Sequence, residues 1–378
     1  MKCIGRDAIS GETIEVEFDR VINYVDPVLD ESSIRPGTFL CAGFIDLQVN
    51  GFAGVDFNLP STSVSQMEAA HLAIASTGVT RYFPTVITAS EPHIIACLRN
   101  LARFEAFEAF HVEGPHISAE DGPRGAHPRE WVRPPDHEEF LRWQDAADGR
   151  VRMVTLAPEW PGACSYIEQL AGAGIVVAIG HTRASAAQIH DAVAAGATLS
   201  THLGNGAGSK DRKDEFIEQQ LSENRLSASF IVDGHHLPAE FLRAAFARKG
   251  VERSVLVTDA VAPAMSEPGP YQLGEVAVEL RADGRVTLRG EDRLAGSSLT
   301  MDQAVSNAMR EAGVSLAEAV VMATSNAARA GRIGNRWRGL KPGERADITQ
   351  FHLAGGRVAI DATYISGQKV FESSASVQ

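Results

Sequence analysis

The stretch IVVAIGHTRASAAQIHDAVAAGATLSTHLG, residues 175–204, contains the alternation that decides the fold. Its first apolar run, 175–180, is typical of a buried strand, and residues 185–194 have the pattern of a helix. A second apolar run follows at 198–202. Strand, helix and strand in this order form the repeating unit of folds with a parallel sheet.

The same alternation extends over most of the chain. Apolar runs predict buried strands at 43–49, 80–86, 109–113, 151–157, 175–180, 198–202, 228–232 and 254–258, with helical patterns between most of them. Eight strands with intervening helices predict a (β/α)8 barrel of the TIM type. The alternative is an open, doubly wound sheet. That fold usually has a glycine-rich phosphate loop after its first strand, and Gly43–Gly51 contains no G-x-G-x-x-G.

Composition limits the classes of protein and partner. The chain has 378 residues, 44% of them hydrophobic, which is enough for a barrel of about 250 residues and a smaller unit. A net charge of −13 predicts no nucleic-acid partner and no anionic membrane partner. The four cysteines are scattered, and the first residues lack the apolar stretch of a signal peptide. We therefore expect reduced thiols and a cytoplasmic protein.

Several of the predicted strands end at a residue that can bind a metal ion or move a proton. The third run ends in Glu113, the fifth in His181 and the sixth in His202, and the eighth leads into Asp259. In a parallel barrel all these strand ends open on one face, so the side chains converge there.

This set of residues suits the hydrolysis of an amide. Two imidazoles and one carboxylate can hold a divalent ion and leave a position open for water, which fits Glu113, His181 and His202. A separate carboxylate, here Asp259, must take the proton from water and return it to the leaving nitrogen. We expect one divalent metal ion per chain and predict it to be zinc.

Longer motifs extend from these strand ends over nearly the whole chain. They are GFIDLQVNGFAGVDF at 43–57, HVEGPHIS at 111–118, GAHP at 125–128, IGHT at 179–182, THLGNGAG at 201–208, DGHH at 233–236, LVTDAV at 256–261, LAGSSLTM at 294–301 and LKPGERADIT at 340–349. In order and spacing they resemble the N-acetylglucosamine-6-phosphate deacetylases of the amidohydrolase superfamily. The resemblance implies a (β/α)8 catalytic barrel at 41–340, and a small β-sandwich domain built from both chain termini, 1–40 plus 341–378. Short alternating runs at both ends of the chain agree with this.

The resemblance also assigns roles to single residues. Glu113, His181 and His202 correspond to the metal ligands, and Asp259 to the catalytic aspartate. Gln48 and Asn50 stand where most amidohydrolases have His-x-His for a second metal, which implies a single-metal site. The remaining assignments are His127 as a catalytic and substrate-contacting histidine, and His236, Asn205 and Gly206 as substrate-binding residues.

One segment departs from the family pattern. The family's phosphate-binding arginine, which acts across a homodimer interface, is replaced by the segment SKDRKDE at 209–215. We expect a basic side chain of this segment, Arg212 or one of its neighbours Lys210 and Lys213, to contact the substrate phosphate in a homodimer.

Three functions remain open at this point. The leading hypothesis is removal of the acetyl group from N-acetylglucosamine 6-phosphate, which yields glucosamine 6-phosphate and acetate. The second is deacylation of an unphosphorylated or different N-acyl substrate, and the third is metal binding without turnover.

Overall fold

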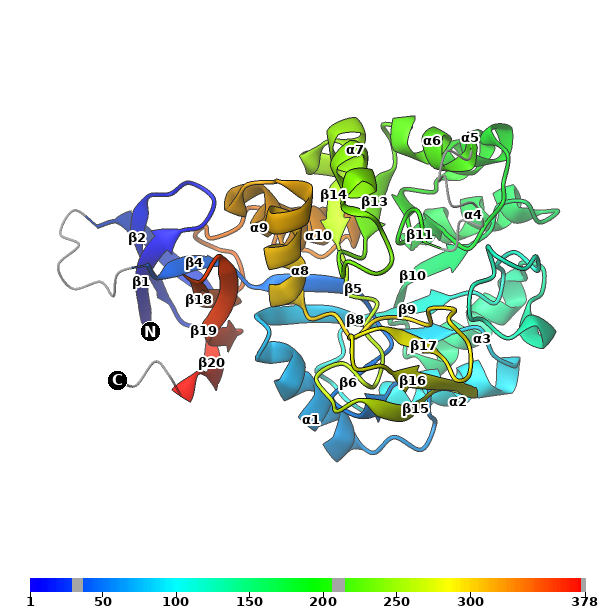
Figure 1. Cartoon of the computed structure of the whole chain (residues 1–378), viewed down its shortest axis with the longest axis horizontal. Coiled ribbons are helices and arrows are strands. Elements are labelled where there is room, and N and C mark those ends of the chain that lie inside the picture. The colour runs from blue at the N-terminus through cyan, green and yellow to red at the C-terminus, as the bar shows by residue number, and fades with distance from the viewer. Residues whose placement is uncertain (29–36, 206–214, 375–378) are drawn as a thin grey trace.

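Two large sheets dominate the computed structural model, which describes residues 1–28, 37–205 and 215–374 (Figure 1). An eight-stranded parallel sheet forms the barrel at the centre and right of the view. A seven-stranded sheet on the left contains both chain ends. Within the described ranges, no helix is long and apolar enough to cross a membrane.

The eight barrel strands follow one another in sequence order around the sheet. They are β5 (Phe44–Val49), β8 (Val79–Ile87), β9 (Phe110–Glu113), β10 (Val151–Leu156), β11 (Val176–Ile179), β12 (Leu199–Ser200), β13 (Ser227–Phe230) and β14 (Ser254–Leu256). The barrel closes after β14, where the Asp259 backbone N–H donates to the Gln48 carbonyl oxygen at 3.1 Å. All six residues of β5 are buried, because a barrel strand has packed side chains on both faces. The predicted barrel is confirmed.

Helices cover the outside of the barrel. They are α1 (Val64–Ala75), α2 (Glu91–Leu101), α3 (His137–Ala146), α4 (Ala163–Gly172), α5 (Ala186–Ala195), α6 (Glu215–Ser222), α7 (Ala239–Lys249), α8 (Met301–Asn307), α9 (Leu316–Ala323) and α10 (Ser325–Ala330). Local sequence defines several of their starts. In α5, the Ser185 hydroxyl accepts from the Gln188 backbone N–H, and the Gln188 side chain accepts from the Ser185 N–H. This capping box satisfies two backbone donors that the first helical turn leaves unpaired.

Strands from both termini form the separate sheet. Its order is β20-β19-β18-β4-β1-β2-β3, with β1 (Lys2–Asp7), β2 (Thr13–Phe18), β3 (Ile22–Pro27), β4 (Phe39–Ala42), β18 (Ile348–Ala354), β19 (Arg357–Ile365) and β20 (Gln368–Glu372). A second hydrophobic core, which includes Val16, Phe18, Leu40 and Ile348, lies against these strands. The expected separate unit of terminal strands is therefore confirmed. Strand β4 spans the boundary expected at residue 40.

A further sheet was not expected from the sequence. Strands β15 (Gly269–Leu273), β16 (Val276–Leu280) and β17 (Val286–Leu288) form an antiparallel meander after β14. It has a small core of its own, which includes Val278 and Val286. The short pair β6 (Gly51–Phe52) and β7 (Val55–Asp56) follows β5 on the same side of the barrel (Figure 1).

Candidate active site

The predicted metal ligands meet at the C-terminal ends of the barrel strands. The His202 Nε2 atom lies 2.8 Å from Glu113 Oε1, and His181 Nε2 lies 3.4 Å from the same oxygen. The three side chains are 2–7% exposed. The strand ends therefore bring these three residues together as the sequence predicts.

The backbone turns sharply where these side chains leave their strands. His181, His202 and Asp259 have φ values of 50°, 28° and 51°. Residues other than glycine rarely adopt this left-handed region, and such strain is found mostly at functional sites. At each of these positions the turn ends a strand.

His127 lies within reach of the same centre. Its Nδ1 atom hydrogen-bonds with the Thr88 hydroxyl at 2.8 Å, and its Nε2 lies 3.7 Å from Glu113 Oε2. Ligand atoms of Glu113, His127 and His181 all lie within 4.8 Å of one another, so this trio could also hold a metal ion. His202 contacts the glutamate more closely than His127 does, which favours His202 as the third ligand.

Two amides occupy the place where a second metal would need ligands. The Gln48 Nε2 group donates to Glu113 Oε1 at 2.9 Å and to Asp259 Oδ1 at 3.1 Å. The Asn50 Nδ2 group donates to the same Asp259 oxygen at 2.7 Å. Both amides are buried, and their donated hydrogen bonds hold Asp259 and Glu113 in fixed positions.

The donor set fits a divalent ion. A carboxylate and imidazole nitrogens are ordinary zinc ligands. His202 Nδ1, Gln48 Oε1 and Asn50 Oδ1 are buried and have no hydrogen-bond partner within the described parts of the chain. Buried polar atoms are rarely left unpaired, so each of these atoms is expected to have a polar partner such as a ligand or an ordered water.

Burial and the neighbouring charges shift the ionisation of the site. Burial opposes the charged form of Glu113, but His202 and His181 hold the pKa of this carboxyl well below its ordinary value. Burial and the adjacent Glu113 raise the pKa of Asp259 to about 6. Burial, with His181 nearby, lowers the pKa of His127 to about 3, so its imidazole is neutral at pH 7. A carboxyl with a pKa near neutrality suits a group that accepts and then returns a proton.

The site opens into a cavity of about 310 Å³. Asn205, His236 and Arg293 lie in its wall, along with Glu113, His127, His181 and Asp259. His236 Nδ1 lies 2.6 Å from Asp233 Oδ2, which fixes the orientation of the ring. His235 lines the cavity too, because 233–237 form a bend and the alternation of a strand does not apply there.

Some of the residues expected to bind the substrate are not among those that the structure describes. Gly206, Arg212, Lys210 and Lys213 lie outside the described residues.

Sequence reasoning missed Arg293 and the meander that precedes it. Arg293 reaches the cavity wall, where its Nη1 group donates to the Gly125 carbonyl oxygen at 3.3 Å. Leu273, at the end of β15, lines the same cavity. The signal was present in the run VAVELRADGRVTL at 276–288, where alternating residues flank an Asp-Gly turn.

Comparison with known proteins agrees with this geometry. The model of the amidohydrolase family matches residues 39–370, and the chain belongs to that family. It is thus a hydrolase of the amidohydrolase type.

Particular relatives are similar over most of their length. The human N-acetylglucosamine-6-phosphate deacetylase is 34% identical over 369 residues, 93% of this chain and 88% of that protein. The N-acetylgalactosamine-6-phosphate deacetylase of Escherichia coli O157:H7 is 33% identical, over 87% of this chain and 88% of that protein.

A solved structure is similar as well. It is the structure of a mutant N-acetyl-D-glucosamine-6-phosphate deacetylase of Mycobacterium smegmatis in complex with N-acetyl-D-glucosamine-6-phosphate. Its TM-score is 0.87 at 31% identity, with 96% of this chain and 95% of that one covered. Within the amidohydrolases, this chain falls among the N-acetylglucosamine-6-phosphate deacetylases.

Proposed function

We propose that this protein removes the acetyl group from N-acetylglucosamine 6-phosphate, and that it uses one zinc ion held by Glu113, His181 and His202. The observation that carries the proposal is the convergence of these ligands beside Asp259, whose carboxylate is held by two amide donors. The names of the similar proteins support the choice of substrate.

The residues of the chain have separate tasks in this reaction. A divalent ion bound there would polarise the acetyl carbonyl and lower the pKa of the attacking water. Asp259 takes a proton from that water and delivers it to the sugar nitrogen as the C–N bond breaks. Gln48 and Asn50 hold the Asp259 oxygen in place. His127, neutral and hydrogen-bonded to Thr88 through Nδ1, contacts the substrate through Nε2.

Substrate recognition involves other residues that line the cavity. We assign Asn205 and His236 to the sugar, and Arg293 to its phosphate. Arg293 is the one lysine or arginine side chain that lines the cavity in the described part of the chain. Arg212 remains a proposed contact from a partner subunit in a homodimer.

The division into a terminal unit, 1–40 plus 341–378, and a barrel, 41–340, also remains a proposal. A cytoplasmic location is proposed as well.

Replacing Asp259 with Asn tests the chemistry. The amide keeps the shape of the carboxyl group but cannot carry the proton, so acetate release should fall by about 10²- to 10⁴-fold. Metal content should stay near one equivalent per chain. Activity within a few-fold of the parent would exclude Asp259 from proton transfer.

Metal retention separates the two possible ligand sets. His202→Ala should lose bound zinc on dialysis, whereas His127→Ala should keep it and lose turnover. If His127→Ala loses the metal and His202→Ala retains it, His127 is the ligand instead.

The epimeric substrate is the second candidate, because the relative that acts on N-acetylgalactosamine 6-phosphate is similar to the same degree. The test compares kcat/KM for both 6-phosphates and for free N-acetylglucosamine. We expect kcat/KM to be highest for N-acetylglucosamine 6-phosphate. Preference for the free sugar would favour the unphosphorylated substrate class.

A further inference from the structure

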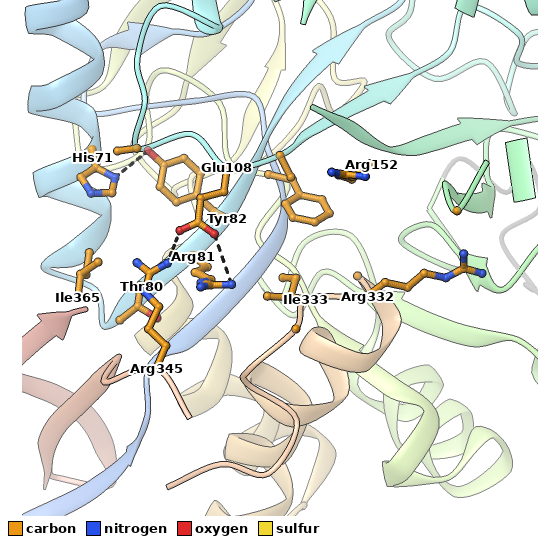
Figure 2. Close-up of a pocket in the computed structure, with 16 residues that line it drawn as sticks. His71, Thr80, Arg81, Tyr82, Glu108, Arg152, Arg332, Ile333, Arg345 and Ile365 are labelled. Carbon is orange, nitrogen blue, oxygen red and sulfur yellow. Dashed lines mark hydrogen bonds and ion pairs between the residues drawn. The ribbon is translucent and has the colours of Figure 1, made fainter. Parts of the chain in front are cut away.

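A second cavity lies at the opposite end of the barrel from the catalytic site. Its volume is about 450 Å³. Thr80–Phe83 near the start of β8, Arg152 at the start of β10 and Gly174 before β11 form one wall. Arg332 and Ile333, after α10, and Arg345 and Ile365 of the terminal unit form the other (Figure 2). Small-molecule sites often occur where two such units meet.

Arginines dominate the charge of this cavity. Arg81, Arg152, Arg332 and Arg345 line it, and Glu108 is the one acidic residue among the lining residues. The Glu108 carboxylate lies between the guanidinium groups of Arg81 and Arg345 (Figure 2). In a chain with a net charge of −13, such a local excess of positive charge marks a place for an anion.

Two of the four arginines, Arg81 and Arg345, are paired with acidic groups. Behind the cavity, Asp347 lies 3.0 Å from Arg345 Nε and 3.4 Å from Arg81 Nε, and it is also the partner of Arg336. These two arginines therefore add positive charge to the wall, while their Nε atoms stay within ion-pair distance of Asp347.

The other two guanidinium groups have no partner in the part of the chain that the structure describes. The side chains of Arg152 and Arg332 make no ion pair or hydrogen bond with any described residue, and both are exposed. Arg152 is the one exposed residue of β10. Arg332 has a φ of 52°, a strained conformation that tends to persist where function requires it.

We propose that this cavity binds a small organic phosphate. The paired N–H groups of arginine match the geometry of a phosphate, and Arg152 and Arg332 are free to supply them. Tyr82, Phe83, Ile333 and Ile365 provide apolar walls for the organic part. The site lies at the N-terminal ends of the strands, so its occupancy does not depend on the proposed reaction.

A double variant, Arg152→Ala with Arg332→Ala, tests the site. Neither side chain has a partner to lose, and alanine bears the same backbone strain at 332 as arginine, so the fold should be unchanged. Arg248→Ala is the matched control, because Arg248 is an exposed arginine on α7 that lines neither cavity. The probes are inorganic phosphate, glycerol 3-phosphate and glucose 6-phosphate, with glucose as the uncharged comparison.

Amide hydrogen exchange followed by mass spectrometry separates this site from the catalytic one. The two organic phosphates should slow exchange at 331–335 in the parent and in Arg248→Ala, and glucose should not. In the double variant the apparent Kd for this effect should rise at least tenfold, while any protection around 113–127 is retained. Calorimetric titration gives the Kd independently.

Several results would overturn the proposal. One is a lack of protection at 331–335 with all three phosphates at millimolar concentration. Another is equal protection in the double variant. If inorganic phosphate binds as tightly as the organic phosphates, the apolar walls contribute nothing and the assignment to an organic ligand fails.

Discussion

Asp46 lies in β5 near Asp259, the proposed catalytic aspartate, and is 1% exposed. Its Oδ2 atom lies 2.5 Å from the Thr258 hydroxyl, and its Oδ1 accepts from the backbone N–H groups of Gln48 and Thr258. Burial raises its pKa from 3.8 to about 7. Folding therefore favours the protonated carboxyl in spite of these hydrogen bonds, and the nearby negative charge of Asp259 acts in the same direction as burial.

Asp46→Asn should reveal this as a pH effect on stability. The folded parent keeps the proton between pH 4 and 7, where the unfolded chain has lost it, so this contribution to stability falls as pH rises through that window. An amide has no such proton. The free energy of unfolding of the parent relative to Asp46→Asn should fall by a few kcal/mol, at about 1.4 kcal/mol per pKa unit, and level off above pH 7. Chemical denaturation at several pH values measures it, and a constant difference would contradict the raised pKa.

Arg293 offers a residue-scale test of phosphate recognition. Arg293→Ala should raise KM for the 6-phosphorylated substrate by roughly tenfold, since charge-assisted hydrogen bonds typically contribute about 1.5–3 kcal/mol. KM for free N-acetylglucosamine should not change. Arg281→Ala serves as a control, because Arg281 in the loop after β16 pairs with Asp292 and does not line the cavity. An equal rise in KM for both sugars would show a general structural effect.

At the scale of elements, the sequence predicted the barrel strands closely. The run 151–157 corresponds to β10 at Val151–Leu156, in which every residue except Arg152 is buried because a barrel strand packs on both faces. The run 198–202 was too long, since β12 ends at Ser200 and the chain then turns at His202. The meander β15–β17 was missed because its alternating pattern lay between regions that already fitted the barrel repeat.

The arrangement of the candidate site was only partly predictable. Parallel strands of a barrel end on one face, so the order of the strands alone predicts that Glu113, His181 and His202 converge. The hydrogen bonds from the Gln48 and Asn50 amides to Asp259 could not be predicted from the sequence. Such a prediction must place residues about 210 positions apart to within an ångström. The same holds for Arg293, which reaches the cavity from an inserted sheet.

Gly180 connects β11 to His181, the first of the two proposed metal-binding histidines, and its lack of a side chain is required by packing. A Cβ there would lie 2.7 Å from Thr155 Cγ2 and 2.9 Å from Thr201 Cβ, inside the barrel. These two threonines hydrogen-bond to each other at 2.7 Å. Gly180→Ala should therefore destabilise the fold by about 1–3 kcal/mol and weaken zinc retention, because β11 and β12 are pushed apart.

Gly172→Ala is the matched control for this prediction. Gly172 ends α4, and an added Cβ meets no atom within 4 Å. Alanine should be neutral there or stabilise the helix by up to about 1 kcal/mol. Thermal unfolding and metal analysis of both variants decide the matter. If Gly180→Ala and Gly172→Ala had the same thermal stability and zinc content, the space beside Gly180 would be large enough for a methyl group.

At the scale of the whole molecule, one buried arginine joins the terminal sheet to the barrel. Arg336 is 1% exposed, and its Nη1 lies 2.5 Å from Oδ2 of Asp347. Asp347 is the residue that precedes β18. The same guanidinium group donates to the Thr80 hydroxyl of β8 at 3.2 Å and to the Gly43 carbonyl oxygen before β5. A single side chain thus crosses between the two sheets.

Arg336→Met should destabilise the protein by about 3 kcal/mol, the lower end of the range for a broken buried ion pair. The lower end applies because Asp347 keeps Arg345, at 3.0 Å, as a partner. Arg285→Met, which removes an exposed pair with Asp283, should cost at most about 1 kcal/mol. Urea unfolding of both variants measures the difference. A loss below 1 kcal/mol for Arg336→Met would mean that packing alone, and not this arginine, holds the terminal sheet on the barrel.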